Sequence, residues 1–115
     1  MRIGEVARRA GVSVRALRYY EEQGLLVPHR GPGGQREYAE DAIDRVLVIQ
    51  QFYAAGLPSR RIVELLPCID ADATTVHQLS VLRAERDRIS SQVEQLAATL
   101  GRLDAVIDAA ESRRP

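Results

Sequence analysis

Hydrophobic positions at the start of the chain predict two short helices separated by a tight turn. Apolar residues recur every three to four positions, first at Ile3, Val6, Ala7 and Ala10, and again at Val14, Leu17 and Tyr20. Gly11, between the two runs, can take the left-handed conformation that ends a helix. Ser13 can cap the next helix by accepting a hydrogen bond from an early backbone N–H, and Gly24 ends the second run. Two short helices joined by a glycine turn are the outline of a helix-turn-helix.

The segment after Gly24 predicts a small β-hairpin. Residues 25–28 (Leu-Leu-Val-Pro) are expected to form a short strand that proline stops, and residues 35–38 (Gln-Arg-Glu-Tyr) the returning strand. Residues 29–34 between them are a loop by composition, because most of them are glycine or proline. The hairpin would form a wing beside the helix-turn-helix.

Two further helices are expected before the middle of the chain. Apolar spacing predicts a third helix over about 40–55 and a short fourth one over 59–66. We expect Pro67 to stop the fourth helix, because proline lacks the backbone N–H that a helix interior needs. Residues 70–74 are then a linker or cap.

The last segment has the most regular pattern. A helix over about 75–110 would be about 54 Å long at ~1.5 Å per residue. It carries an unbroken heptad repeat, typical of a coiled-coil seam: Leu79, Leu82, Arg86, Ile89, Val93, Leu96, Leu100, Leu103 and Ile107. No turn lets the segment fold back on itself, so the eight apolar seam residues are the predicted dimer interface. Arg86 either fixes the register of the coiled coil or reaches solvent.

Together these elements predict a mainly α fold. A winged helix-turn-helix DNA-binding domain with a small β-hairpin wing is expected over 1–69, and a linker over 70–74. A coiled-coil dimerisation helix would follow over 75–111, and a disordered tail over 112–115.

Composition excludes several classes of protein. There is no run of about 18 apolar residues, so no transmembrane helix is expected, and the N-terminus is unlike a signal peptide. We therefore expect a cytoplasmic protein with no membrane partner. The pattern holds no paired carboxylates, no nucleophile–base set and no phosphate-binding loop, so we expect no enzymatic activity.

Charges are unevenly distributed although their sum is zero. Six arginines fall within residues 8–36, against only two acidic residues, Glu21 and Glu22. Every basic residue of the chain is arginine, whose planar fork donates two hydrogen bonds at once to a phosphate or a guanine edge. Because this cluster overlaps the predicted helix-turn-helix and wing, it indicates binding to nucleic acid.

Several short motifs, in this order and spacing, resemble the MerR family of bacterial transcriptional regulators. They are Ile3-Gly4-Glu5-Val6-Ala7, Gly11-Val12-Ser13, Arg15-Ala16-Leu17-Arg18-Tyr19-Tyr20-Glu21, Gly24-Leu25-Leu26, Gly34-Gln35-Arg36-Glu37-Tyr38, Ala55-Gly56-Leu57-Pro58 and Ile62. The long C-terminal helix follows where the family has its dimer helix. The resemblance implies a winged helix-turn-helix with an antiparallel coiled coil.

The resemblance also implies a set of DNA-binding residues. Arg15 and Arg18 lie one turn apart on the second helix and are expected in the major groove. Tyr19 and Tyr20 also belong to the DNA-binding set, with Tyr19 expected to face a phosphate and Tyr20 to lie at least partly in the core. The remaining candidates are expected at phosphates, from the wing and from the start of the fourth helix: Arg36, Tyr38, Arg60 and Arg61. Arg36 and Tyr38 would share one side of the wing strand because strand side chains alternate.

The mechanism that the resemblance implies acts through DNA. A homodimer would bind a palindromic operator in double-stranded promoter DNA and bend and untwist it, realigning the promoter elements for RNA polymerase, which is thus engaged indirectly. The alternative is an architectural, excisionase-like protein that bends DNA without promoter control. Such a protein has little need for a long dimer helix.

Metal binding has two candidate ligands, Cys68 and His77. One thiolate and one imidazole per chain are too few for a tetrahedral site, although two chains can pool them. A lone buried cysteine usually serves as a small hydrophobic residue. We therefore expect no metal, no cofactor and no redox switch in this chain, and no ligand domain after about residue 110.

Overall fold

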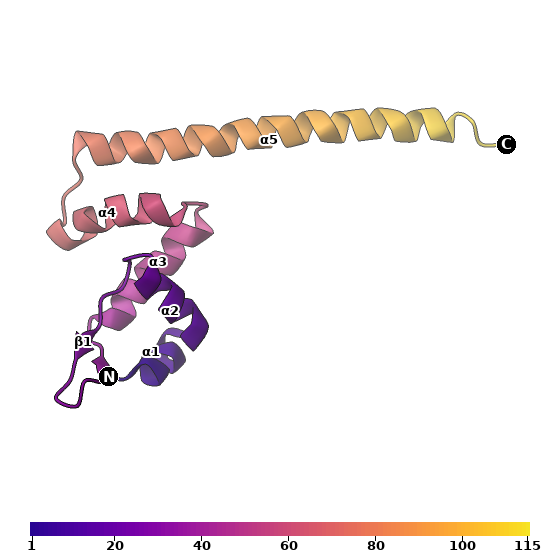
Figure 1. The fold of residues 1–115 in the computed structure, drawn as a ribbon. Coiled ribbons are helices and arrows are strands. Elements are labelled where there is room, and N and C mark those ends of the chain that lie inside the picture. The colour runs from indigo at the N-terminus through magenta and orange to yellow at the C-terminus, as the bar shows by residue number, and fades with distance from the viewer. The chain divides into compact units, whose positions relative to one another are not determined.

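The computed structural model describes all 115 residues and divides into two units, residues 1–78, called the head below, and residues 79–115. The elements appear in Figure 1 in this order: α1 (Ile3–Ala10), α2 (Val14–Glu22), β1 (His29–Arg30), β2 (Arg36–Glu37), α3 (Ala42–Ala54), α4 (Ser59–Ala71) and α5 (Val76–Glu111). This confirms the expected fold class, mainly helical with a small hairpin and a long last helix. None of the helices is both long and apolar enough to cross a membrane.

The core of the head is built from the apolar faces of its helices. α1 packs against α2 and α3, and α3 packs against α4. The largest fully buried side chains come from all four helices: Val6, Leu17, Val46, Ile49, Ile62 and Leu65. The three-to-four spacing of apolar residues puts these side chains on one face of each helix.

The turn between α1 and α2 has the expected chemistry. Gly11 adopts a left-handed conformation with φ of 73°, and Val12 N–H closes the end of α1 on the carbonyl of Ala7 (3.0 Å). Ser13 Oγ accepts a hydrogen bond from Ala16 N–H (3.0 Å), which caps α2. This tight turn fixes the direction of α2 relative to α1.

The first wing strand lies later than predicted. Residues 25–28 form no strand: Leu25 and Leu26 pack into the core instead, and Pro28 has no N–H to donate to a strand ladder. Pairing starts immediately after Pro28, with His29 opposite Glu37 and Arg30 opposite Arg36 in antiparallel register. The wing is therefore a hairpin of two residue pairs with a glycine- and proline-rich tip.

The fourth helix is longer than predicted. α4 continues through Pro67 to Ala71 and ends at Asp72, which is left-handed with φ of 50°. Proline removes one helical hydrogen bond, but Leu65 and Leu66 bury the helix face on the preceding turn. Arg45 of α3 pairs with Asp70 at 2.6 Å and ties down the last turn. Asp70 and Ala71, expected in a linker, are thus helical.

α5 begins with a cap that the sequence analysis missed. Thr75 Oγ1 accepts a hydrogen bond from Gln78 N–H (3.1 Å), and Gln78 Oε1 accepts one from Thr75 N–H (2.9 Å). This reciprocal pair is a capping box, in which threonine at the cap and glutamine three residues later satisfy each other's backbone donors. It explains why the long helix starts at Val76.

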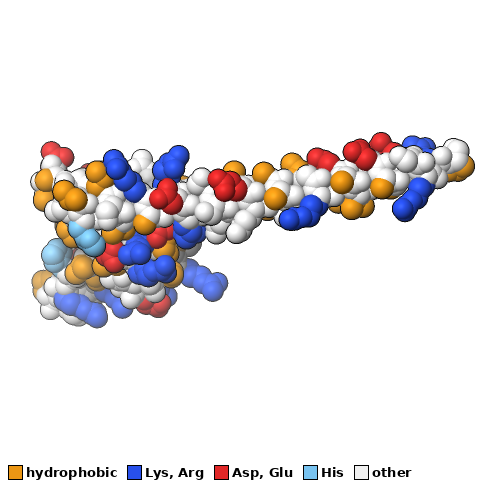
Figure 2. Space-filling view, turned by 90° about the horizontal axis from the view of Figure 1, so that it is seen from above, with side chains coloured by type: hydrophobic (Ala, Val, Ile, Leu, Met, Phe, Trp, Pro, Cys, Tyr) orange, Lys and Arg blue, Asp and Glu red, His pale blue; other side chains and the backbone are white.

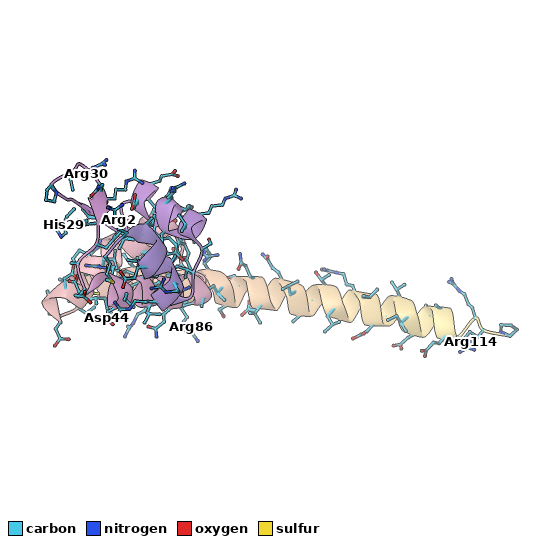
Figure 3. All side chains as sticks on the ribbon, turned by 90° about the horizontal axis from the view of Figure 1, so that it is seen from below. Arg2, His29, Arg30, Asp44, Arg86 and Arg114 are labelled. Atoms are coloured by element: carbon cyan, nitrogen blue, oxygen red, sulfur yellow. The ribbon has the colours of Figure 1, made fainter.

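The apolar seam of α5 is largely uncovered in the single chain. Of the predicted interface residues, Leu82 and Ile89 are half-buried. The other six are exposed: Leu79, Val93, Leu96, Leu100, Leu103 and Ile107. Figure 2 shows hydrophobic side chains along α5 among charged ones. Arg86, labelled in Figure 3, is exposed and lies 3.7 Å from Asp87.

Candidate nucleic-acid interface

α2 presents its arginines to solvent, as the sequence predicts. Arg15 and Arg18 are exposed, three positions apart on the same helix face. Neither guanidinium forms a hydrogen bond or an ion pair within the chain. Both are therefore available to an external acceptor such as a phosphate oxygen or a guanine edge.

The two neighbouring tyrosines of α2 point in different directions. Tyr19 is 42% exposed, whereas Tyr20 is only 9% exposed and stacks on Tyr53 of α3 with ring centroids 5.8 Å apart. This confirms the expected orientation of the pair. Tyr20 thus serves mainly in packing, and the outward side chain is Tyr19.

A chain of hydroxyl groups joins α2 to the start of α4. Ser59 Oγ lies 2.5 Å from the hydroxyl of Tyr53 and 3.4 Å from that of Tyr19. Ser59 is the first residue of α4 and immediately precedes Arg60 and Arg61. No local sequence pattern points to Ser59 and Tyr53, because Ser59 lies 40 positions after Tyr19.

The wing supplies exposed arginines, but one of the two side chains predicted to face DNA from the wing is buried. Arg36 is exposed, with Nη1 3.3 Å from Glu21 Oε2. Tyr38 is buried, only 3% exposed, and its hydroxyl donates to Glu21 Oε1. Strand alternation failed as a guide because β2 ends at Glu37, so Tyr38 lies beyond the paired residues.

Arg30 is a wing residue that the sequence analysis did not select. It is exposed, and its Nη1 donates to the carbonyl of Gly34 across the loop (2.9 Å). Figure 3 shows Arg30 and His29 on the wing. The sequence signal for this residue was an arginine next to a glycine- and proline-rich loop. Such loops lie on the protein surface, where a charged side chain is free to contact a partner.

The two arginines at the start of α4 differ in their surroundings. Arg60 is exposed, while Arg61 is half-buried and pairs with Glu64 at 3.1 Å. No side chain caps this helix, because Pro58 occupies the cap position. Arginines at the positive end of a helix dipole are unfavourable unless an anion lies nearby. A phosphate beside Arg60 would offset that cost.

Cys68 and His77, the two candidate metal ligands, belong to no group of metal-ligating side chains within the single chain. Cys68 donates its thiol hydrogen to the carbonyl of Leu65 (2.8 Å), and His77 is exposed. No group of three or more His, Cys, Asp or Glu side chains within the chain is arranged to hold a metal ion.

Packing of Tyr20 predicts a measurable pH dependence. Burial, and then the neighbouring Tyr53, raises the pKa of Tyr20 above its ordinary value of about 10. The folded state therefore holds this proton more tightly than the unfolded state, and the resulting stability is present at neutral pH and lost as pH rises above about 10. Denaturant unfolding should show wild type losing stability relative to Tyr20→Phe across this alkaline range. A difference in unfolding free energy between the two proteins that stays constant over this range would contradict the raised pKa of Tyr20.

Comparison with known proteins identifies the family. Residues 1–68 match the model of the MerR HTH family regulatory protein. The HTH-type transcriptional regulator HmrR of Rhizobium leguminosarum bv. viciae is 31% identical over 99 residues, which is 86% of this chain and 66% of HmrR. The chain thus spans just under two thirds of that relative.

Two solved structures share the fold and part of the sequence. The transcription regulator PbrR691 from Ralstonia metallidurans CH34, solved in complex with lead(II), has a TM-score of 0.81 and 28% identity over the whole chain and 88% of PbrR691. EcmrR, solved in an EcmrR–DNA complex, has a TM-score of 0.80 and 26% identity, over the whole chain and 41% of EcmrR. With its helix-turn-helix, wing and long last helix, the chain belongs to the MerR HTH family of DNA-binding transcriptional regulators.

Proposed function

We propose that this chain works as a homodimer that binds a palindromic promoter operator and distorts the DNA to control transcription. The observation that carries the proposal is the pair of exposed, unpartnered arginines on α2, Arg15 and Arg18, beside the arginines of the wing. Homologues of the chain are found bound to promoter DNA and in an RNA polymerase open complex. RNA polymerase is therefore the proposed indirect partner.

The proposed contacts divide into two kinds. Arg15 and Arg18 would read base edges in the major groove, where a bidentate arginine–guanine pair discriminates by about 1–3 kcal/mol. The phosphate contacts would come from α2, the wing and α4: Tyr19, Arg36, Arg60 and Arg61. Burial of Tyr20 and Tyr38 gives these two a supporting role instead.

The proposed dimer supplies the spacing that two half-sites need. Recognition helices of a dimer must reach major grooves about 34–36 Å apart, or a multiple of that. The apolar seam of α5 supports this assembly, because six of its side chains are exposed in the single chain. An antiparallel pair of α5 helices would set the distance between the two α2 helices.

Control of transcription would use the energy of binding to deform DNA. Bending a DNA site of about 20–30 base pairs by about 40–90° costs on the order of 1–6 kcal/mol. Contacts that the protein makes only with the bent DNA must offset this cost. Phosphate contacts from the wing and from α4, which both follow the recognition helix in the chain, would add to its own contacts and are suited to this role. The test is transcription by purified RNA polymerase from promoters that the protein footprints, with spacers of natural and shortened length. Bending without any spacer-dependent change in transcript would support the architectural alternative instead.

Salt dependence tests the phosphate contacts. Each contact contributes a slope of about −0.9 in a plot of log affinity against log salt concentration. Arg36→Ala and Arg60→Ala should each make the slope shallower by about one per contact removed and leave the sequence preference unchanged. Titration of operator DNA at several salt concentrations measures both quantities. Arg114→Ala, in the C-terminal tail, removes the same charge elsewhere and should leave the slope unchanged. A changed base preference in either variant would mean that the division into base and phosphate contacts is wrong.

A further inference from the structure

Glu21 is an acidic residue in the most basic part of the chain. It lies on α2, three residues after Arg18, and its side chain is only 11% exposed. A carboxylate near the proposed phosphate contacts repels DNA, which by itself lowers affinity. The contacts of Glu21 indicate what offsets this cost.

The two oxygens of the carboxylate take two partners from the same part of the wing. Oε1 accepts a hydrogen bond from the hydroxyl of Tyr38, and Oε2 lies 3.3 Å from Nη1 of Arg36. Both partners belong to the segment at and just after β2. One carboxylate thus joins the recognition helix to the wing.

Tyr38, which donates a hydrogen bond to Glu21, is itself held in place by other contacts. Its side chain is buried, and its backbone pairs in both directions with Met1: Tyr38 N–H donates to the carbonyl of Met1 (2.7 Å), and the ammonium of Met1 donates to the carbonyl of Tyr38 (2.9 Å). The carboxylate of Glu21 is therefore held on one side by a residue with little freedom to move.

Arg36 is the exposed partner. Its side chain is 44% exposed, and a guanidinium is a planar fork whose N–H groups point along fixed directions. With one nitrogen at ion-pair distance from Glu21, the others remain available to solvent. Such an arginine can donate to the carboxylate and to a phosphate at the same time, in a single orientation.

We propose that Glu21 is a positioning residue for DNA binding: its carboxylate orients the guanidinium of Arg36 toward a phosphate and holds the wing at a set distance from α2. The inference rests on the proposed phosphate contact of Arg36. It gives an acidic residue a favourable effect on affinity for a polyanion, which is the opposite of what its charge alone predicts.

The test is a double-mutant cycle of Glu21→Gln and Arg36→Ala. Glutamine keeps the size of the side chain and an acceptor for Tyr38, but it loses the charge that orients Arg36. The probe is a DNA duplex selected by the wild-type protein from a random-sequence library, and the readout is Kd. We expect Glu21→Gln to weaken binding about fivefold to tenfold in the wild-type background and by less than about twofold in the Arg36→Ala background, as for coupled neighbours.

Glu22→Gln is the matched control. Glu22 is the next residue, is exposed, and has no hydrogen bond or ion pair in the chain. Removing this anion changes the net charge in the same way, so charge alone predicts the same effect in both variants. We expect Glu22→Gln to leave binding unchanged or to tighten it, and Glu21→Gln to weaken it.

Other outcomes would overturn the inference. If Glu21→Gln tightens binding equally in both backgrounds, Glu21 acts only as a repelling charge. If it weakens binding equally in both, its role is structural and does not pass through Arg36. If Arg36→Ala alone changes neither Kd nor the salt slope, the proposed phosphate contact fails, and the inference fails with it.

A second variant keeps the test valid if Glu21→Gln does not fold, as judged by circular dichroism. Tyr38→Phe retains the buried ring and removes only the hydroxyl that holds the carboxylate. It should weaken binding in the same direction, and again the effect should disappear in the Arg36→Ala background. An effect of Tyr38→Phe that is independent of Arg36 would contradict the proposal.

Discussion

Leu96→Asp should convert the protein from a dimer to a monomer at micromolar concentration. Leu96 lies near the middle of the α5 seam and is 69% exposed in the single chain. In the proposed dimer each copy would bury this side chain. Removing it should cost about 1.5–3 kcal/mol of dimerisation free energy per copy. The substitution also places two carboxylates in a low-dielectric seam, where unpaired charge is strongly disfavoured.

Sedimentation velocity measures this effect directly. Ala98→Asp is the matched control, because residue 98 lies two positions from Leu96 and off the heptad seam. This control should dimerise like wild type although it carries the same new side chain. Operator affinity should fall with dimerisation in Leu96→Asp, because a monomer engages one half-site at a time. A monomeric wild-type protein, or a dimeric Leu96→Asp variant, would contradict the proposal that the α5 seam is the dimer interface.

Arg18→Ala should cause the largest loss of sequence preference. A bidentate arginine–guanine contact discriminates by about 1–3 kcal/mol, and the proposed dimer makes it twice, once in each half-site. The exposed, unpartnered state of Arg18 means that its removal costs the head no internal contact. Affinity for the operator should therefore fall while thermal stability stays close to wild type.

The measurement compares Kd for the operator with Kd for duplexes substituted at one base pair of each half-site. Arg18→Ala should bind one of these substituted duplexes as well as the operator, which wild type does not. Arg18→Lys is an informative companion, because it keeps the charge and loses the bidentate fork. Its salt slope should stay near wild type while its preference at that base pair falls. A loss of affinity that is uniform over all duplexes would instead make Arg18 a phosphate contact.

Local patterns predicted the helices and, apart from the C-terminal end of α4, their approximate boundaries. Helical spacing located the core residues Val6 and Leu17, and the chemistry of Gly11 and Ser13 located the turn between α1 and α2. These features depend on neighbours within about one helical turn. The direction of the tyrosine pair was also predictable, since adjacent helical residues point apart.

Features that depend on distant partners were missed or misplaced. Tyr38 is buried because it meets Glu21 and Met1, which lie 17 and 37 positions away. The end of α4 is held by Arg45, 25 positions before Asp70. Tertiary contacts of this kind override local rules on strand alternation and on proline, and a single sequence carries no direct signal for them.

Dimerisation through the exposed seam of α5, as proposed, would make the amount of protein itself a variable in regulation. If the active form is a dimer, the concentration of dimer rises with the square of the monomer concentration while monomer predominates, by mass action. Operator occupancy would then respond to expression more steeply than that of a monomeric binder. Pairing of the seam and stability of α5 would also be linked, so dilution would lower both together. A modest change in synthesis or proteolysis would in this way act as a threshold, without any small molecule or metal.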